Sequence, residues 1–324
     1  MVPIWQLRSI KEAASRPEFY RFLTVGLKDL LFKAYREAPT TYEQLVTFET
    51  SLKDKEGYPS LGSVGLPERV LEGQPYNERS LPSDDLVELT NQKFGQIIAI
   101  TEELIEDDQT KMIVRLPMDL GNAHKKHEDK TVYSLINGNA TGYDSQNIFS
   151  LNHPGFTGGA ALAANDNIYT NVTLSANAVA VVLGIIAGWV GHADDDILDV
   201  TATDLVVPKN LAHTAKLLTQ SNFLGLAYAA GVFGPAANIG QGVNVLKEQN
   251  LGVISSARLD KTSTTDWYVK TDFPGLLFQW RTRLQMLAEN EASGVRFERD
   301  VMRWKTKARW VAKFLNWRWG VKVS

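Results

Sequence analysis

Residues 101–139 show the longest run of helical periodicity in the chain. Apolar side chains recur there at helical spacing, with acids and lysines between them: Ile105, Met112, Leu116, Leu120, Ala123 and Leu135. Thr101 can cap the first turn by accepting a backbone N–H bond, and Gly138 can end the helix in a left-handed conformation. The apolar positions keep no strict heptad, which argues against a coiled-coil arm. We predict one helix, on the order of 50 Å long at about 1.5 Å per residue, that bends at Pro117 and carries the other parts of the molecule.

The first hundred residues predict a second helix followed by two strands. Apolar side chains from Phe19 to Ala34 keep helical spacing, whereas residues 42–51 and 87–100 have the pattern of strands. Between the strands lie about 35 residues rich in glycine, proline and charge, and unstructured loops of that length are uncommon in compact domains. A two-stranded ribbon alone is marginal in water. We therefore expect residues 51–83 to project from the molecule and to be ordered only by a neighbouring molecule.

The region after the long helix predicts a separate lobe. We expect helices at 176–189 and 210–220, a short buried strand at 204–207, and a strand pair formed by 251–257 and 266–271. Residues 222–244 are rich in glycine and alanine, which are small enough for close packing. The chain leaves this lobe near Pro274.

The clearest strand signal lies at residues 301–314. Four basic residues alternate with five mostly apolar ones: Arg303, Lys305, Lys307 and Arg309 against Met302, Trp304, Thr306, Ala308 and Trp310. A period of two gives a strand with one basic face and one apolar face. The tryptophans lie opposite the basic residues, whereas a platform that stacks nucleic-acid bases needs aromatic rings beside the charge. A surface of opposite charge is the expected partner of the basic face.

The composition of the chain excludes several classes of protein. With 324 residues and 36.0 kDa, the chain is long enough for two or more lobes. It has no cysteine, so disulfides and thiolate metal sites are excluded. The longest apolar run, 179–190, is too short to cross a bilayer, and the formal net charge of −3 gives no global reason to bind nucleic acid. No signal-peptide pattern is present, so we expect the protein to be made and folded in a reducing cytoplasm.

The sequence contains no convincing active site. It has no phosphate-binding loop and no Gly-x-Ser-x-Gly elbow, and its one G-x-G, at Gly240 and Gly242, lacks the third glycine. His124 and His127 share a helix face, for which a solvated face is the simpler interpretation than a metal site. His192, beside acids at 194–196, is one candidate for binding a hard cation, and a charged turn is the simpler alternative. We predict no catalytic residue, cofactor or resident metal.

Several short stretches resemble the Mu-like major head subunit family of tailed phages, which has the Hong Kong 97 fold. They are Ile105-Glu106-Asp107-Asp108-Gln109, Gly142-Tyr143-Asp144, Asn147-Ile148-Phe149, Asn152-His153-Pro154, Asp204-Leu205-Val206-Val207-Pro208 and Asp266-Trp267-Tyr268. The resemblance covers most of the chain from about residue 40 onward.

This resemblance implies an α+β capsid fold and a structural role. Its parts would be an N-arm with the first helix (1–41), an E-loop (42–100), a P-domain with the spine helix (101–170), an A-domain (171–273) and returning P-domain strands (274–324). The protein would be a major capsid protein that forms pentamers and hexamers and an icosahedral shell around double-stranded DNA, without a membrane. No long charged N-terminal extension is seen, which favours a separate scaffolding protein, beside a portal.

The resemblance also suggests where subunits meet. In the family the E-loop lies across a neighbouring subunit, so we favour its acids as the partner of the basic strand, including Glu68, Glu72, Glu78, Asp84 and Asp85. The alternatives are packaged DNA and a solvated strand face with nothing opposite. The candidate contact residues are Lys53, Lys55, Glu68, Arg69, Glu72, Glu78, Arg79, Arg303, Lys305, Lys307 and Arg309. Two alternatives remain, an encapsulin-like protein compartment and a cytoplasmic metal-dependent enzyme that uses the turn at His192.

Overall fold

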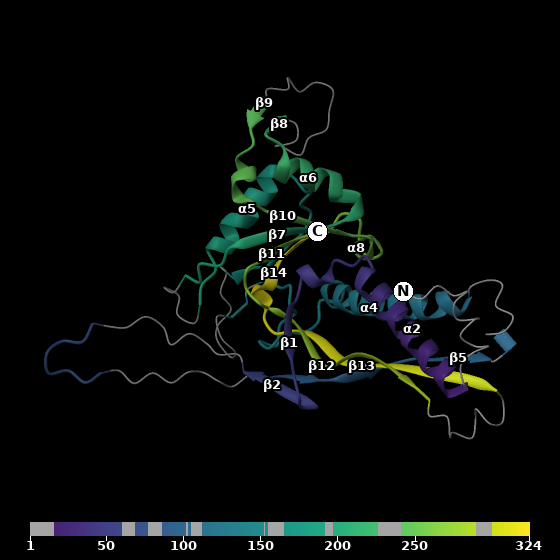
Figure 1. The fold of residues 1–324 in the computed structure, drawn as a ribbon. Helices are drawn as coiled ribbons and strands as arrows, with labels where there is room; N and C mark the ends of the chain where they lie inside the picture. The colour runs from purple at the N-terminus through teal and green to yellow at the C-terminus, as the bar shows by residue number, and fades with distance from the viewer. Residues whose placement is uncertain are drawn as a thin grey trace.

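The computed structural model describes residues 16–59, 69–76, 86–101, 103–104, 112–151, 153–154, 165–191, 197–225, 241–289 and 300–324. These residues form two lobes, each built around a five-stranded sheet, and a thin extension (Figure 1).

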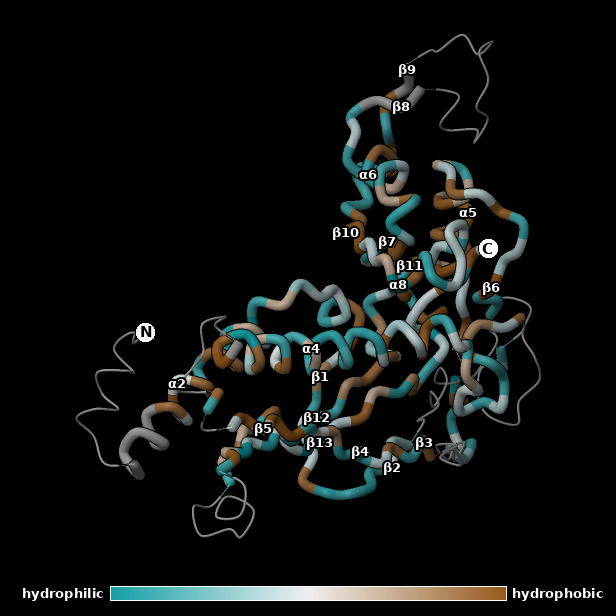
Figure 2. The backbone as a smooth tube through the Cα atoms, turned by 90° about the vertical axis from the view of Figure 1, so that its right-hand side faces the viewer, coloured by the Kyte–Doolittle hydropathy of each residue, from teal (hydrophilic) through white to brown (hydrophobic). Residues whose placement is uncertain are grey.

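The first lobe is a sheet covered on one face by two helices. The strand order is β1–β12–β13–β4, with β5 also paired to β13. The strands are β1 (Thr47–Thr50), β12 (Leu276–Ala288), β13 (Val301–Phe314), β4 (Gln92–Phe94) and β5 (Ile97–Thr101). The helices are α2 (Arg16–Glu37) and α4 (Met112–Gly138), and α4 runs along one face of the sheet (Figure 2). A short 3-10 helix, η1 (Tyr42–Gln44), joins α2 to β1.

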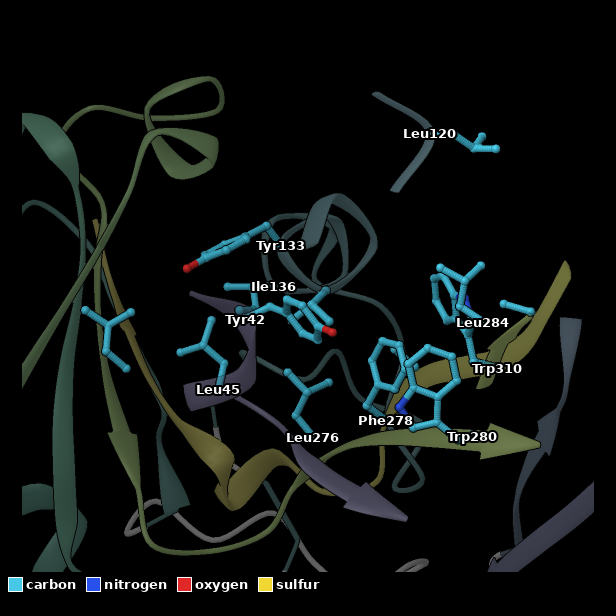
Figure 3. Packing of buried hydrophobic residues seen from close by; sticks show 14 of the residues in the cluster. Tyr42, Leu45, Leu120, Tyr133, Ile136, Leu276, Phe278, Trp280, Leu284 and Trp310 are labelled. Carbon is cyan, nitrogen blue, oxygen red and sulfur yellow. The ribbon is translucent and has the colours of Figure 1, made fainter. Parts of the chain in front are cut away.

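Aromatic side chains form the core between this sheet and α4. Phe278 stacks on Trp310 with ring centroids 4.8 Å apart, and Trp280 lies beside them. Tyr133 and Ile136 of α4 belong to the same cluster, and Tyr42 of η1 lies between them and Phe278 (Figure 3). Burying a large apolar side chain contributes about 1.5–3 kcal/mol, so this cluster fixes the sheet against the helix.

The second lobe contains a mixed sheet with two longer helices and one short helix beside it. The strand order is β10–β7–β11–β14–β6. The strands are β10 (Gly252–Ser256), β7 (Ala202–Pro208), β11 (Trp267–Thr271), β14 (Gly320–Val323) and β6 (Ile168–Tyr169). The helices are α5 (Ala176–Ala187), α6 (Ala212–Gln220) and the short α8 (Ala257–Asp260), with 3-10 turns η3 (Lys209–Leu211), η4 (Val245–Gln249) and η5 (Trp317–Trp319). A small hairpin, β8 (Phe223–Gly225) and β9 (Gln241–Val243), lies at the tip of the lobe (Figure 1).

The extension begins as an antiparallel ribbon of β2 (Lys55–Pro59) and β3 (Leu86–Thr90). Val87 and Leu89 are buried against Leu277 of β12, and Gln279 donates a 2.6 Å hydrogen bond to Glu56. The base of the ribbon is thus fixed by its own chain, which corrects the expectation that the ribbon depends entirely on a neighbour. Residues 69–76 are exposed at every position and lie at the far end of the extension in Figure 1.

The strand predicted at 87–100 is three strands, and Gly95 explains one break. A Cβ atom at Gly95 would lie 2.3 Å from the Thr306 carbonyl oxygen, so only glycine permits this approach to β13. The Gln96 carbonyl oxygen accepts the Thr306 N–H at 2.8 Å. The chain therefore bends around Thr306 between β4 and β5.

Three other expectations need correction. The predicted strands at 251–257 and 266–271 form as β10 and β11, but they do not pair, because β7 lies between them. The final strand β14 joins the second sheet, although the sequence placed 274–324 with the first lobe. The strand predicted at 42–51 begins only at Thr47, after η1.

The predicted long helix is described from Met112 onward, with Pro117 inside it. Thr101 is the last residue of β5, and its hydroxyl accepts the Leu104 N–H at 3.2 Å, as expected of a cap. Residues 105–111, including the Ile105-to-Gln109 motif, lie outside the described residues.

Candidate subunit-contact surface

Strand β13 presents its basic residues away from the helices. Buried side chains alternate with the basic ones along β13, as predicted. The buried residues are Met302, Trp304, Thr306, Ala308 and Trp310. Helices α2 and α4 cover that buried side. The four basic side chains therefore lie on the other face of the sheet, about 6.5–7 Å apart along the strand.

The basic residues differ in their surroundings. Arg303 lies 3.9 Å from Glu289, a weak ion pair. In the part of the chain that the structure describes, Lys305, Lys307 and Arg309 form no ion pair. Lys307 lies opposite Gln285 of β12 in the sheet register. Among the described residues, these three neighbouring positive charges have no acidic partner, so they are candidates for contact with another molecule.

The structure adds residues that sequence reasoning missed. Lys93 of β4 lies directly opposite Arg309, and like charges in such cross-strand positions destabilise a sheet. Lys313 continues the period of two and donates a 3.1 Å hydrogen bond to the Glu88 carbonyl oxygen. The pattern of β13 alone would have revealed Lys313, whereas Lys93 required knowledge of the register.

Two apolar side chains flank Lys305 on the same face. Ile97 of β5 and Leu287 of β12 lie opposite Lys305 from either side, and they are 59% and 37% exposed. We call the following set the basic sheet face: Lys93, Ile97, Leu287, Arg303, Lys305, Lys307, Arg309 and Lys313. Its mixture of positive charge and exposed apolar surface is suited to contact with an acidic, partly apolar partner.

The candidate residues of the extension are spread along it. Lys55 pairs with Glu88 across the ribbon at 3.4 Å, and both side chains are largely exposed, so the pair contributes little. Lys53 lies exposed in the turn before the ribbon. Arg69 and Glu72 lie in the exposed segment 69–76. Glu68, Glu78 and Arg79 lie outside the described residues, as do Asp84 and Asp85.

His124 departs from the solvated face expected for the histidine pair on α4, whereas His127 is exposed as expected. His124 is buried, and its Nε2 lies 2.8 Å from the Thr306 hydroxyl oxygen of β13. The His127 ring packs against Phe94 with centroids 4.8 Å apart. Burial lowers the pKa of both histidines, so these rings serve packing rather than charge.

Two observations concern other functions. No cluster of three metal-binding side chains occurs among the described residues, and the turn at His192 and 194–196 lies outside them. Within the same part of the chain, none of the helices combines the length and hydropathy needed to span a bilayer.

The fold is the Hong Kong 97 type found in shell-forming subunits. The procapsid of bacteriophage JBD30 matches with a TM-score of 0.50 and 18% identity, over 95% of this chain and 75% of that one. The capsid of cyanophage P-SCSP1u matches with a TM-score of 0.55 and 11% identity, over 88% of each chain. A virus-like particle from Pyrococcus furiosus matches with a TM-score of 0.50 and 8% identity, over 92% of this chain and 97% of that one. At these identities the likeness establishes the fold alone.

A match to a family model identifies the protein family as well as the fold. The model described as phage capsid protein matches residues 87–323, so the chain belongs to the phage capsid protein family and is a structural subunit of a shell. The predicted capsid fold and class of protein are therefore confirmed. No curated protein shows a significant match to the chain.

Proposed function

We propose that this chain is the major capsid protein of a tailed phage and that it forms pentamers and hexamers that close into an icosahedral head. The observation that carries this proposal is the family match, which extends from the ribbon strand β3 to the last strand. The head would hold double-stranded DNA without reading its sequence, and would assemble in the host cytoplasm with a scaffolding protein and a portal. Residues 1–41, 42–100, 101–170, 171–273 and 274–324 would serve as N-arm, E-loop, P-domain, A-domain and returning strands, with β14 completing the A-domain sheet.

We further propose that the basic sheet face binds the extension of a neighbouring copy. Residues 60–85 contain five acids and two arginines, so this segment is opposite in charge to the face. Exposed Val70, Leu71 and Tyr76 offer apolar partners for Ile97 and Leu287. DNA is the less suitable occupant, because the charge is concentrated on one sheet rather than spread over the molecule. A single exposed ion pair is worth only about 0–1 kcal/mol, yet the contact repeats at every subunit of a shell.

Charge reversal tests the proposed contact. We expect Lys305→Glu to lower the yield of shells at low salt, and a second change, Glu72→Lys, to restore part of the yield. Lys130→Glu, on the exposed side of α4, is the matched control and should assemble like the parent. If Lys305→Glu assembles as well as the control at low salt, the basic sheet face has no charged partner in the shell.

Electron microscopy of the parent protein separates the proposed function from its alternatives. DNA-filled or scaffold-dependent heads support the phage capsid. Small uniform shells that contain protein would instead favour the encapsulin-like compartment, and discrete small oligomers would favour an enzyme. These outcomes do not depend on whether the basic sheet face is the contact.

A further inference from the structure

A buried polar cluster lies where the two lobes join, away from the basic sheet face. It contains Asp144 and His153 from the segment after α4, Asn167 just before β6, and Trp317 in η5 just before β14. All four side chains are buried. Asp144 and His153 belong to two of the short motifs that carry the family resemblance, and nothing in the shell function uses them directly.

The orientation of the Asn167 amide is fixed by backbone groups. Its Nδ2 donates to three carbonyl oxygens, those of Ile148 at 2.7 Å, Trp317 at 3.2 Å and Gly320 at 3.3 Å. Its Oδ1 accepts the Ser150 N–H at 2.7 Å. The reverse orientation would place the amide oxygen against three carbonyl oxygens. The atom that faces the His153 ring is therefore an acceptor.

This orientation requires a proton on each ring nitrogen of His153. The Nε2 atom lies 3.2 Å from Asn167 Oδ1, so Nε2 must donate. The Nδ1 atom lies 2.5 Å from Asp144 Oδ2, and the other oxygen of that carboxylate accepts the Gln146 N–H at 3.1 Å. The pair therefore holds one proton more than a neutral imidazole beside a carboxylate. That proton belongs on the imidazole, which is the stronger base of the two groups in water.

The aromatic neighbour favours the same charge. The His153 ring stacks on Trp317 with centroids 4.6 Å apart and planes within 7°, and the face of an indole attracts a cation. Two other charged residues are close: the Arg318 guanidinium lies 5.5 Å from the Trp317 ring centroid, and Asp166 precedes Asn167 in the chain. Asp144 is the charge in direct contact.

We propose that His153 is held as an imidazolium cation by Asp144, and that this cation links residues 139–154 to the β6–β14 edge through its Nε2–H bond to Asn167 and its stacking on Trp317. A neutral ring would keep its hydrogen on Nδ1, which faces the Asp144 carboxylate, and would place an unprotonated Nε2 against the Asn167 oxygen, so the hydrogen bond across the junction would be lost. The second ring proton therefore stabilises the attachment of residues 139–154 to the β6–β14 edge.

Nitrogen NMR of histidine-labelled subunits tests the charge directly. We expect both ring nitrogens of His153 to carry hydrogen at neutral pH, and a ring with one proton there would overturn the proposal. His153→Gln removes the signal and so assigns it. Should that variant not fold, substitution of His124, His127, His192 and His213 in turn leaves the His153 signal by elimination.

A second variant tests this link. In Asp144→Asn the ring loses its ionic partner, so we expect His153 to carry a single ring proton at neutral pH and the denaturant midpoint to fall below that of the parent. A folded variant that keeps the parent's midpoint would mean that the pair does not control the junction, and an unfolded variant leaves the spectrum of the parent to decide the charge.

Discussion

Glu128 is the most deeply buried carboxyl group on α4, with 1% of its surface exposed. The Tyr42 hydroxyl donates to it at 2.6 Å and the Tyr35 hydroxyl at 2.8 Å, so it ties α2 and η1 to α4. Lys125 lies 4.0 Å away and also pairs with Glu43. Burial raises the pKa of Glu128 to about 7, and the hydroxyl hydrogen bonds and Lys125 offset only part of that effect.

This raised pKa gives stability a pH dependence of known sign. The folded protein binds the Glu128 proton more tightly than the unfolded chain, whose carboxyl has the ordinary value near 4.5. The contribution is therefore complete below about pH 4.5 and is lost as the pH rises through about 7. We expect Glu128→Gln to remove a decline of about 1–3 kcal/mol in the free energy of unfolding between those limits, measured by denaturant titration of unassembled subunits.

The matched control for this effect is Glu37→Gln in α2. Glu37 is largely exposed, and its one ion pair among the described residues is with Lys33 at 4.0 Å, so its removal should leave the pH dependence of the parent. If Glu128→Gln declines with pH as steeply as the control, Glu128 is not the group responsible.

At the scale of elements, the contact between α2 and α4 depends on the absence of a side chain. A Cβ atom at Gly121 of α4 would lie 2.4 Å from the Leu31 carbonyl oxygen and 3.1 Å from the Tyr35 nitrogen. Both are backbone atoms of α2, so the whole helix would have to move. We expect Gly121→Ala to lower the free energy of unfolding by about 1–3 kcal/mol, as measured by chemical denaturation.

A glycine of α2 supplies the comparison. Gly26 has open space around its Cβ position, so Gly26→Ala should be neutral or should stabilise the helix by up to about 1 kcal/mol. Equal stability of the two variants would show that the helices do not touch at Gly121.

The elements also show what local sequence can and cannot predict. The strand at 301–314 was predictable because its period of two lies within one segment. The separation of β10 from β11 was not, because β7, which lies between them in the sheet, is some fifty residues earlier in the chain. Burial of His124 depends on Thr306, which is distant in sequence. Likewise, the place of Lys93 on the basic sheet face follows from its register with Arg309.

At the scale of the molecule, the sequence could predict the order of the helices, strands and extension along the chain. It could not predict the contacts that join them. The motifs that suggested a capsid protein turn out to be structural: Ile148 and Phe149 belong to the core of the first lobe, and Asp144 pairs with His153. Such contacts join segments that no periodicity connects. The candidate contact surface was therefore predicted in part, from β13, while its neighbours came from the sheet.

The extension permits a test of assembly on the whole molecule. Residues 69–76 are exposed throughout, and the one hydrogen bond between backbone groups within this described segment is that from Gln74 to Leu71, at 3.0 Å. Amides with so little protection exchange quickly, so we expect rapid hydrogen exchange here in unassembled subunits and slow exchange in shells, measured by mass spectrometry. Ribbon strand β3 is the internal control, because Val87 and Leu89 are buried against Leu277 in the subunit itself, and its amides should be protected in both states. If residues 69–76 exchange equally fast in shells, the segment binds no neighbour, and the proposed contact with the basic sheet face must be made by another part of the chain.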